Sequence, residues 1–275
     1  MIKVILTTNF SESTRNAMNY AVHLFGNENT EYIIMNTYID SPTGNDGFLS
    51  VDELQERGGT KHLRKEEQLL RAAFPDKNLT IRIHSTYGLL ASAINDAVKD
   101  LKANYVVIGN RSKYNFEAAM LRAKTYELID KIECPVLAVP VDRKFTPGEG
   151  GLIFASDMHR IKYPEQIKPL IGIAKYHKVP VMVINVKKPQ EDMTKKEEEA
   201  GEQLEDIFSS IPHEFHHLKN EDVKKGIRKF VDAHGRSLLV LLARKQNIFQ
   251  RFTQQSLTKE MSRLAEMPLL ILHDY

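Results

Sequence analysis

An imperfect internal repeat constrains the fold of this chain more than any other feature. Residues 105–140 read YVVIGNRSKYNFEAAMLRAKTYELIDKIECPVLAVP, and residues 239–274 read LVLLARKQNIFQRFTQQSLTKEMSRLAEMPLLILHD. Each stretch has an apolar run, a basic loop, a helical pattern and a second apolar run that follows a proline. The two prolines, Pro135 and Pro268, are 133 residues apart. This period is too long for a solenoid unit and predicts two copies of one domain.

The order of elements predicts the fold class. Apolar runs alternate with helical patterns along the first half, which predicts an α/β fold with a doubly wound parallel five-stranded sheet. Helices are expected after each first strand. The first is expected at residues 14–25, and the second, with Pro164 near its start and Pro169 in its first turns, ends at about residue 177. The glycine-rich linker at residues 143–151 separates a first domain, 1–142, from a second domain, 149–275, that is shorter by about 15 residues.

Two polar positions recur in the second half. The run LIFAS leads to Asp157, which falls where Asn9 stands after the first strand of the chain. Asn185 lies within the second strand of its copy as Asn36 does in the first copy, 149 residues earlier. Because ligands of open parallel sheets bind outside the carboxyl ends of the strands, the residues at these ends, Asn9 and Asp157 among them, are candidates for a site.

Composition excludes several classes of protein. The chain has 38 basic and 36 acidic residues, so its net charge of +2 predicts no general attraction to nucleic acid. No apolar run approaches the roughly 20 residues that a membrane helix needs. The N-terminus has no signal-peptide cleavage pattern, and the single cysteine, Cys134, is expected to be a small buried residue. These features predict a cytoplasmic protein without a membrane or nucleic-acid partner.

Several motifs, taken in this order, resemble the universal stress protein family. In the first half they are KVILTTNFSEST, YVVIGNR and ECPVLAVP, and in the second half LIFASD, LVLLARK, FTQQSLTKEM and MPLLIL. The resemblance implies a Rossmann-like, adenine nucleotide alpha hydrolase-like fold in each half. It also implies that the two domains pair through their last strands, residues 136–141 and 269–272. A further homodimer and a protein partner stay open.

The resemblance allows a test for ATP binding in the first copy. Family members that bind ATP carry a loop of the form G-x2-G-x9-G-[ST], whose glycines let the backbone approach the phosphates. Here Gly109 is kept, Ser112 replaces the second glycine, and Arg122–Ala123 stands in place of the final pair, with the hydroxyl of Thr125 nearby. Asn9 replaces the aspartate that meets the adenine or ribose in those members.

The second copy departs from the same pattern in another way. It keeps Asp157, and Ser256 stands near the hydroxyl position. Ala243, Gln246 and Gln255 replace all three glycines, and each adds a Cβ where the family's backbone approaches a phosphate. Neither copy therefore has the usual ATP-binding pattern.

The loops are basic instead, which allows two interpretations. Arginine side chains can bind an anion or nucleotide without glycine amides, or the loops are solvated helix faces whose phenylalanines belong to the core. The basic residues are Arg111, Lys113, Arg122, Lys124, Arg244, Lys245 and Arg251, and the phenylalanines are Phe116, Phe249 and Phe252. The candidate nucleotide or anion site consists of Asn9, Thr37, Gly109, Arg111, Ser112, Thr125, Asp157, Val186, Lys245 and Ser256.

Histidine and serine patterns predict neither a metal site nor a catalytic site. In HEFHHL, His216 and His217 would point to opposite faces of a strand, and no cysteine or HExxH partner accompanies them. We expect this segment to be an exposed edge strand. Ser156, Asp157 and His159 share one turn, which does not make a catalytic triad.

Three functional hypotheses follow. The first is a stress-response binding and signalling module, not an enzyme, that works without the usual ATP-binding loop and needs no cofactor. The second is a sensor that binds ATP, AMP or another adenine nucleotide through the first-copy loop from Gly109 to Ser112. The third is a nucleotide hydrolase with weak ATPase activity, which would require carboxylates and a metal near the phosphates.

Overall fold

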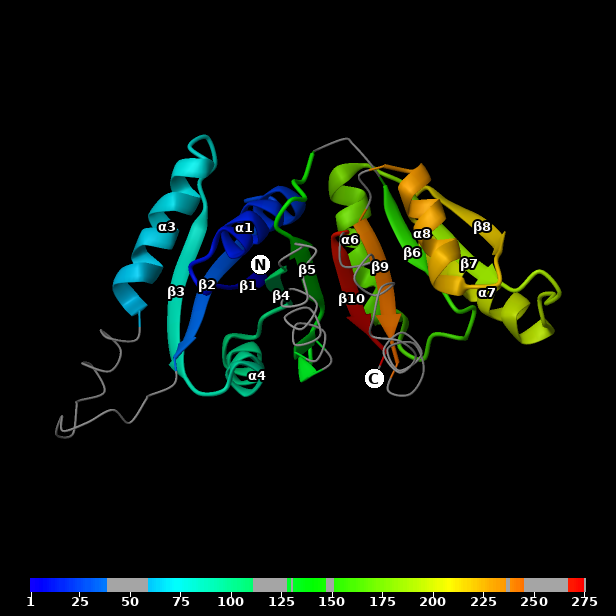
Figure 1. The fold of residues 1–275 in the computed structure, drawn as a ribbon, viewed down its shortest axis with the longest axis horizontal. Coiled ribbons are helices and arrows are strands. Elements are labelled where there is room, and N and C mark those ends of the chain that lie inside the picture. Colours follow the sequence, from blue (N-terminus) through cyan, green and yellow to red (C-terminus); the bar gives the residue numbers. More distant parts are fainter. Residues whose placement is uncertain are drawn as a thin grey trace. The chain divides into compact units, whose positions relative to one another are not determined.

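The computed structural model divides the chain into two compact units, Met1–Lys144 and Phe145–Tyr275. Each unit is a parallel sheet with helices packed on it (Figure 1). The residues that the structure describes are 1–38, 59–110, 128–129, 131–146, 151–235, 238–244 and 267–274.

The first unit is a five-stranded parallel sheet. Its strands lie in the order β3-β2-β1-β4-β5, and each adjacent pair is parallel. Its elements are β1 (Ile2–Thr7), α1 (Glu12–Phe25), β2 (Thr30–Tyr38), α3 (Lys61–Ala73), β3 (Thr80–Tyr87), α4 (Leu90–Leu101), β4 (Tyr105–Asn110) and β5 (Val136–Pro140).

The order of strands in the first unit shows the doubly wound arrangement. The chain moves outward from β1 to β3, and α1 and α3 lie side by side over the sheet (Figure 1). It then crosses to β4 on the other side of β1. Because such crossovers are right-handed, the reversal of direction places α4 on the opposite face from α1 and α3. The expected doubly wound parallel sheet is confirmed.

The second unit has the same strand order. Its strands lie in the order β10-β9-β6-β7-β8, and each adjacent pair is again parallel. Its elements are β6 (Leu152–Ala155), the 3-10 helix η2 (Pro164–Ile167), α6 (Lys168–His177), β7 (Val181–Lys187), α7 (Lys195–Phe208), β8 (His213–Lys219), α8 (Val223–Ala233), β9 (Leu238–Ala243) and β10 (Leu269–His273).

Strands with long apolar runs carry the core of each unit, as those runs predict. Val4, Ile5 and Leu6 of β1 have no exposed surface, and all residues of β9 and β10 are buried. A strand that is apolar on both sides needs cover on both faces of the sheet. This pattern leaves the ends of the strands as the places where polar side chains gather.

The helix that follows the first strand begins later in the second unit than in the first. In the first unit α1 starts at Glu12, five residues after β1 ends. In the second unit no helix starts until Pro164, nine residues after β6 ends at Ala155, and the first turn is 3-10. Pro164 and Pro169 have no backbone N–H to donate within a helix, so they are tolerated only in a first turn. The predicted helix, with Pro164 near its start and its end at about His177, is therefore confirmed.

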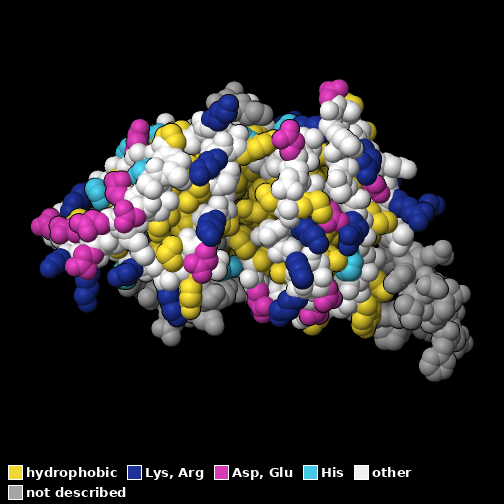
Figure 2. Space-filling model, turned by 180° about the vertical axis from the view of Figure 1, so that it is seen from behind, with side chains coloured by type: hydrophobic (Ala, Val, Ile, Leu, Met, Phe, Trp, Pro, Cys, Tyr) yellow, Lys and Arg dark blue, Asp and Glu magenta, His cyan; other side chains and the backbone are white. Residues whose placement is uncertain are grey.

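Surface charges of both signs are visible on one face of the molecule (Figure 2). On the face shown in Figure 2, lysine and arginine side chains are interspersed with acidic ones. Among the described residues, no helix has the length and apolar character that a membrane span requires.

Candidate functional site

A hydrogen-bonded turn follows β1 at the carboxyl end of the first sheet. The hydroxyl of Thr8 accepts the N–H of Phe10 at 2.9 Å, and Oδ1 of Asn9 accepts the N–H of Ser11 at 3.2 Å. Phe10 has a φ of 65°, which is uncommon for a residue with a side chain. The side chains of Thr8 and Asn9 hold the backbone in this conformation, so Asn9 already has a structural role.

The second unit builds the same turn after β6 with different residues. The hydroxyl of Ser156 accepts the N–H of Met158 at 3.0 Å, and Oδ1 of Asp157 accepts the N–H of His159 at 3.2 Å. Met158 has a φ of 51°, matching the strained residue of the first unit. Short side chains with an oxygen are suited to such turns because they bond to the backbone two residues later.

An asparagine from the neighbouring strand secures each turn. Asn36 donates its amide to the carbonyl of Thr8 at 2.8 Å, and Asn185 donates to the carbonyl of Ser156 at 3.1 Å. The equivalence of these two asparagines, inferred from their spacing in the sequence, is confirmed by this shared geometry. The two units therefore position the carboxyl end of the first strand in the same way.

Gly109 of β4 lies against the first turn of α1. A Cβ added at Gly109 would be 2.5 Å from the carbonyl oxygen of Ser13 and 2.8 Å from Cα of Thr14. Real Cβ atoms do not approach backbone atoms this closely, so only glycine allows α1 to pack here. The glycine that suggested a phosphate loop in the sequence is thus required by the packing of the first unit.

The equivalent position in the second unit carries a side chain. Ala243 ends β9 and is buried. The segment after β6 stays non-helical up to Pro164, so the equivalent of the first turn of α1 is missing. The difference between Gly109 and Ala243 therefore matches the late start of the helix.

The guanidinium of Arg244 joins two carboxylates at the carboxyl end of the second sheet. Its Nη1 is 3.3 Å from Oδ1 of Asp157, and its Nε is 3.4 Å from Oδ2 of Asp274. Its Nη2 donates to the carbonyl of His159 at 2.7 Å. The side chains of Arg244 and Asp274 are 16% and 3% exposed, so this positive charge is largely withdrawn from solvent.

Asp274 also binds the segment that replaces the missing helical turn. Its two carboxylate oxygens accept the N–H groups of Lys162 at 3.2 Å and of Tyr163 at 3.0 Å. A buried carboxylate is tolerated when it is paired and hydrogen-bonded, and Asp274 is both. Sequence reasoning treated Arg244 as part of a basic loop and did not consider Asp274. In the sequence, Arg244 and Asp274 stand out only because each is a charged residue at the end of one of the last two apolar runs.

The candidate residues at the ends of the second strands have packing roles. Val186 of β7 approaches α8 closely, because a Cβ built at Gly226 would be 2.6 Å from its Cγ1. Thr37 of β2 is half-buried and pairs in register with Thr86 of β3. Neither side chain lies in the cluster around Arg244.

Half of the candidate site and most of the basic loops lie outside the described residues. The candidate residues concerned are Arg111, Ser112, Thr125, Lys245 and Ser256. The other loop residues concerned are Lys113, Phe116, Arg122, Lys124, Phe249, Arg251 and Phe252.

The histidines of β8 lie on opposite faces of an end strand of the second unit, as expected. His216 packs against Phe230 of α8 with a centroid distance of 4.9 Å, whereas His217 faces α7. Within the described ranges, no group of three or more His, Cys, Asp or Glu residues could hold a metal. Cys134 is buried, and burial raises the pKa of its thiol to about 12, so it stays protonated.

Acid should destabilise this protein through His273, the last residue of β10. Burial lowers the pKa of His273 to about 4, so the unfolded state binds more protons than the folded state between pH 4 and about 6.5. The free energy of unfolding should therefore fall as the pH drops through this window, by at most about 3 kcal/mol. Urea unfolding at pH 7, 5.5 and 4.5 should show a weaker pH dependence for His273→Gln than for the wild type. Equal slopes would show that His273 is not held neutral.

Comparison with known proteins identifies the family. A model of the universal stress protein family matches residues 1–140, which is half of the chain. The chain belongs to the universal stress protein family. A comparison with curated proteins finds no match.

Solved structures share the fold over nearly the whole chain. A universal stress protein from Archaeoglobus fulgidus DSM 4304 is 14% identical, with a TM-score of 0.68 over 99% of this chain and 96% of its own. A functionally unknown protein from Pseudomonas aeruginosa PAO1 is 11% identical, with a TM-score of 0.56 over 99% of this chain and 92% of its own. A putative universal stress protein from Pseudomonas aeruginosa UCBPP-PA14 is 11% identical, with a TM-score of 0.54 over 98% and 92%. At these identities the likeness establishes the fold alone.

Proposed function

We propose that this chain is a cytoplasmic stress-response binding and signalling module made of two universal stress protein domains, residues 1–142 and 149–275. The family match covers the first domain. The same strand order and the same turn at Asn9 and Asp157 support the second. The module acts on a protein partner and carries no catalytic residues.

The observation that carries this proposal is the ion-paired guanidinium of Arg244. In ATP-binding relatives, the resemblance implies that an aspartate after the first strand meets the adenine or ribose. Here that aspartate, Asp157, pairs with Arg244 and accepts a backbone N–H from His159. A nucleotide at this position would have to break an ion pair that also includes the buried Asp274. The second domain is thus closed to ATP in the usual mode.

A second candidate function is nucleotide sensing by the first domain alone. The residues concerned are Asn9, Thr37 and the loop from Gly109 to Ser112. The feature that favours it is the start of α1, where the side chain of Ser11 makes no capping hydrogen bond to the helix. The N-terminal N–H groups of a helix attract anions when no side chain caps them.

We also propose that the domains pair through their last strands, at residues 136–141 and 269–272. Within their own units, β5 and β10 stand at the ends of the strand order. An unpaired end strand presents free backbone groups that can join another chain, so covering both edges protects the protein from aggregation.

Isothermal titration with ATP, ADP and AMP in the presence of Mg²⁺ tests this function. We expect no saturable binding in the micromolar range and no ATP hydrolysis. A different result would support nucleotide sensing by the first domain instead. The wild type would then bind one nucleotide per chain, Asn9→Ala would abolish this binding, and Asp157→Ala would keep it. Two nucleotides per chain would contradict the closure of the second domain by Arg244.

A further inference from the structure

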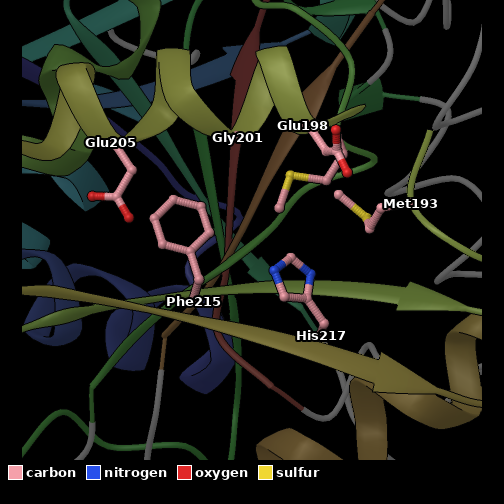
Figure 3. A pocket seen from close by; sticks show the side chains of 7 residues that line it. Met193, Glu198, Gly201, Glu205, Phe215 and His217 are labelled. Carbon is pink, nitrogen blue, oxygen red and sulfur yellow. The ribbon is translucent and has the colours of Figure 1, made fainter. Parts of the chain in front are cut away.

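A small hollow lies between α7 and β8 in the second unit, away from the Arg244 cluster. Its volume is about 270 Å³. Figure 3 shows the side chain of Met193 near the ring of His217, with the ring of Phe215 on the other side of the view. The residues that matter for its chemistry are Met158, Met193, Glu198, Glu205, Phe215 and His217.

The local sequence explains why these side chains meet. Phe215 and His217 are two residues apart on β8, so they project from the same face of the strand. Met158 comes from the strained turn after β6 and is buried, with 1% of its surface exposed. Gly201 of α7 also borders the hollow and leaves it open, since a Cβ there would meet no atom within 4 Å.

The start of α7 is held firmly, which fixes one wall of the hollow. Thr194 and Glu197 form a capping box, in which each side chain accepts the backbone N–H of the other residue. Glu197 also accepts a hydrogen bond from Lys187 at 2.7 Å. Burial would raise the pKa of Glu197, but the hydrogen bonds from Lys187 and Thr194 lower it to about 2. Met193 directly precedes this cap.

The donors around the hollow point to a metal ion. The donors are two thioethers and one imidazole, and thioethers are soft ligands that select Cu(I) over Zn²⁺ or Mg²⁺. Methionine side chains have three rotatable bonds, so their sulfur atoms can converge on an ion.

Two acidic side chains of α7 border the hollow. Glu198 is exposed at its rim, and Glu205 lies on the same face of α7. Glu205 accepts from Nε2 of His213 at 2.7 Å. Burial alone would lower the pKa of His213, but its bonds to the carbonyl of Ile211 and to Glu205 raise it. The ring of Phe215 adds a negative π face beside the hollow, which also attracts cations.

We propose that Met158, Met193 and His217 form a binding site for Cu(I). The site depends neither on nucleotide binding nor on the pairing of the two domains. It needs no redox step, because Cu(I) enters and leaves as the monovalent ion.

Anaerobic competition between the full-length protein and a chromophoric Cu(I) chelator, with ascorbate as reductant, tests the site. We expect one Cu(I) per chain in the wild type. Met158→Leu, Met193→Leu and His217→Asn should each weaken the affinity by at least about tenfold. Leucine conserves the volume of methionine, so these variants should remain folded, which circular dichroism can confirm.

Three control variants and a second probe make the test specific. Met182→Leu on β7, His216→Asn on the other face of β8 and Cys134→Ala should leave the affinity unchanged. Ag(I), which is not reduced or oxidised under these conditions, should shift the methyl signals of Met158 and Met193 in spectra of [¹³C-methyl]methionine-labelled protein. Three results would each overturn the proposal. The wild type could bind no Cu(I), both methionine variants could keep the wild-type affinity, or the control variants could lose as much affinity as the site variants.

Discussion

Replacing Gly109 with alanine is expected to lower the free energy of unfolding of the first unit by about 3 kcal/mol. The new methyl group would lie 2.5 Å from the carbonyl oxygen of Ser13, and the atoms it meets belong to the backbone of α1. Backbone atoms cannot rotate away as a flexible side chain can, so α1 must shift from β4. Urea unfolding should show the loss, and hydrogen exchange of the peptides from β1 and β4 should assign it to this unit.

Gly172 provides the matched control for this substitution. It lies in the middle of α6, and a Cβ there would meet no atom within 4 Å. Gly172→Ala should therefore raise the free energy of unfolding by about 0.5–1 kcal/mol, because alanine is a better helix former than glycine. If Gly109→Ala leaves stability unchanged, the glycine is not required for packing, and a role in ligand binding regains support.

Replacing Arg244 with methionine is expected to destabilise the second unit by about 3 kcal/mol. The substitution removes the positive charge that pairs with Asp157 and Asp274. Asp274 has 3% of its side chain exposed, so its negative charge would stay buried without the guanidinium that pairs with it, although the backbone N–H groups of Lys162 and Tyr163 still bind it. Breaking a buried pair on one side costs more than the pair itself contributes, because one charge is left without its partner.

A double-mutant cycle separates this pairing from the loss of side-chain packing. Asp274→Asn combined with Arg244→Met should recover about 2 kcal/mol relative to the sum of the single variants. Arg160→Met serves as the control, since Arg160 is an exposed cation of the same unit and should cost little. Additive effects of the two substitutions would show that Arg244 and Asp274 are not coupled. In that case the closure of the second domain would lose its main support.

The sequence was most informative about elements whose pattern is local. Apolar runs and helical spacing located the strands, and the repeat of the proline-led last strand revealed two copies of one order of elements. The spacing of Asn36 and Asn185 indicated equivalent positions, and both secure the turn after a first strand. Hydrophobic periodicity depends only on neighbours along the chain, so it can be read without coordinates.

The candidate site was less accessible to sequence reasoning because its contacts join distant parts of the chain. Gly109 looked like the remainder of a phosphate loop, yet its neighbour is the backbone of Ser13 on another element. Arg244 looked like one cation of a basic loop, although it pairs with two carboxylates at the ends of other strands.

The sequence alone thus predicted the fold class and an order of elements that occurs twice, and it showed that neither half has the family's glycine pattern. Only the tertiary structure decided what Gly109 and Arg244 do. The physical reason is that close approach and ion pairing depend on which elements the sheet brings together. Strands adjacent in the sheet, such as β6 and β9, are far apart in the chain, and no local pattern records that Arg244 will meet Asp157.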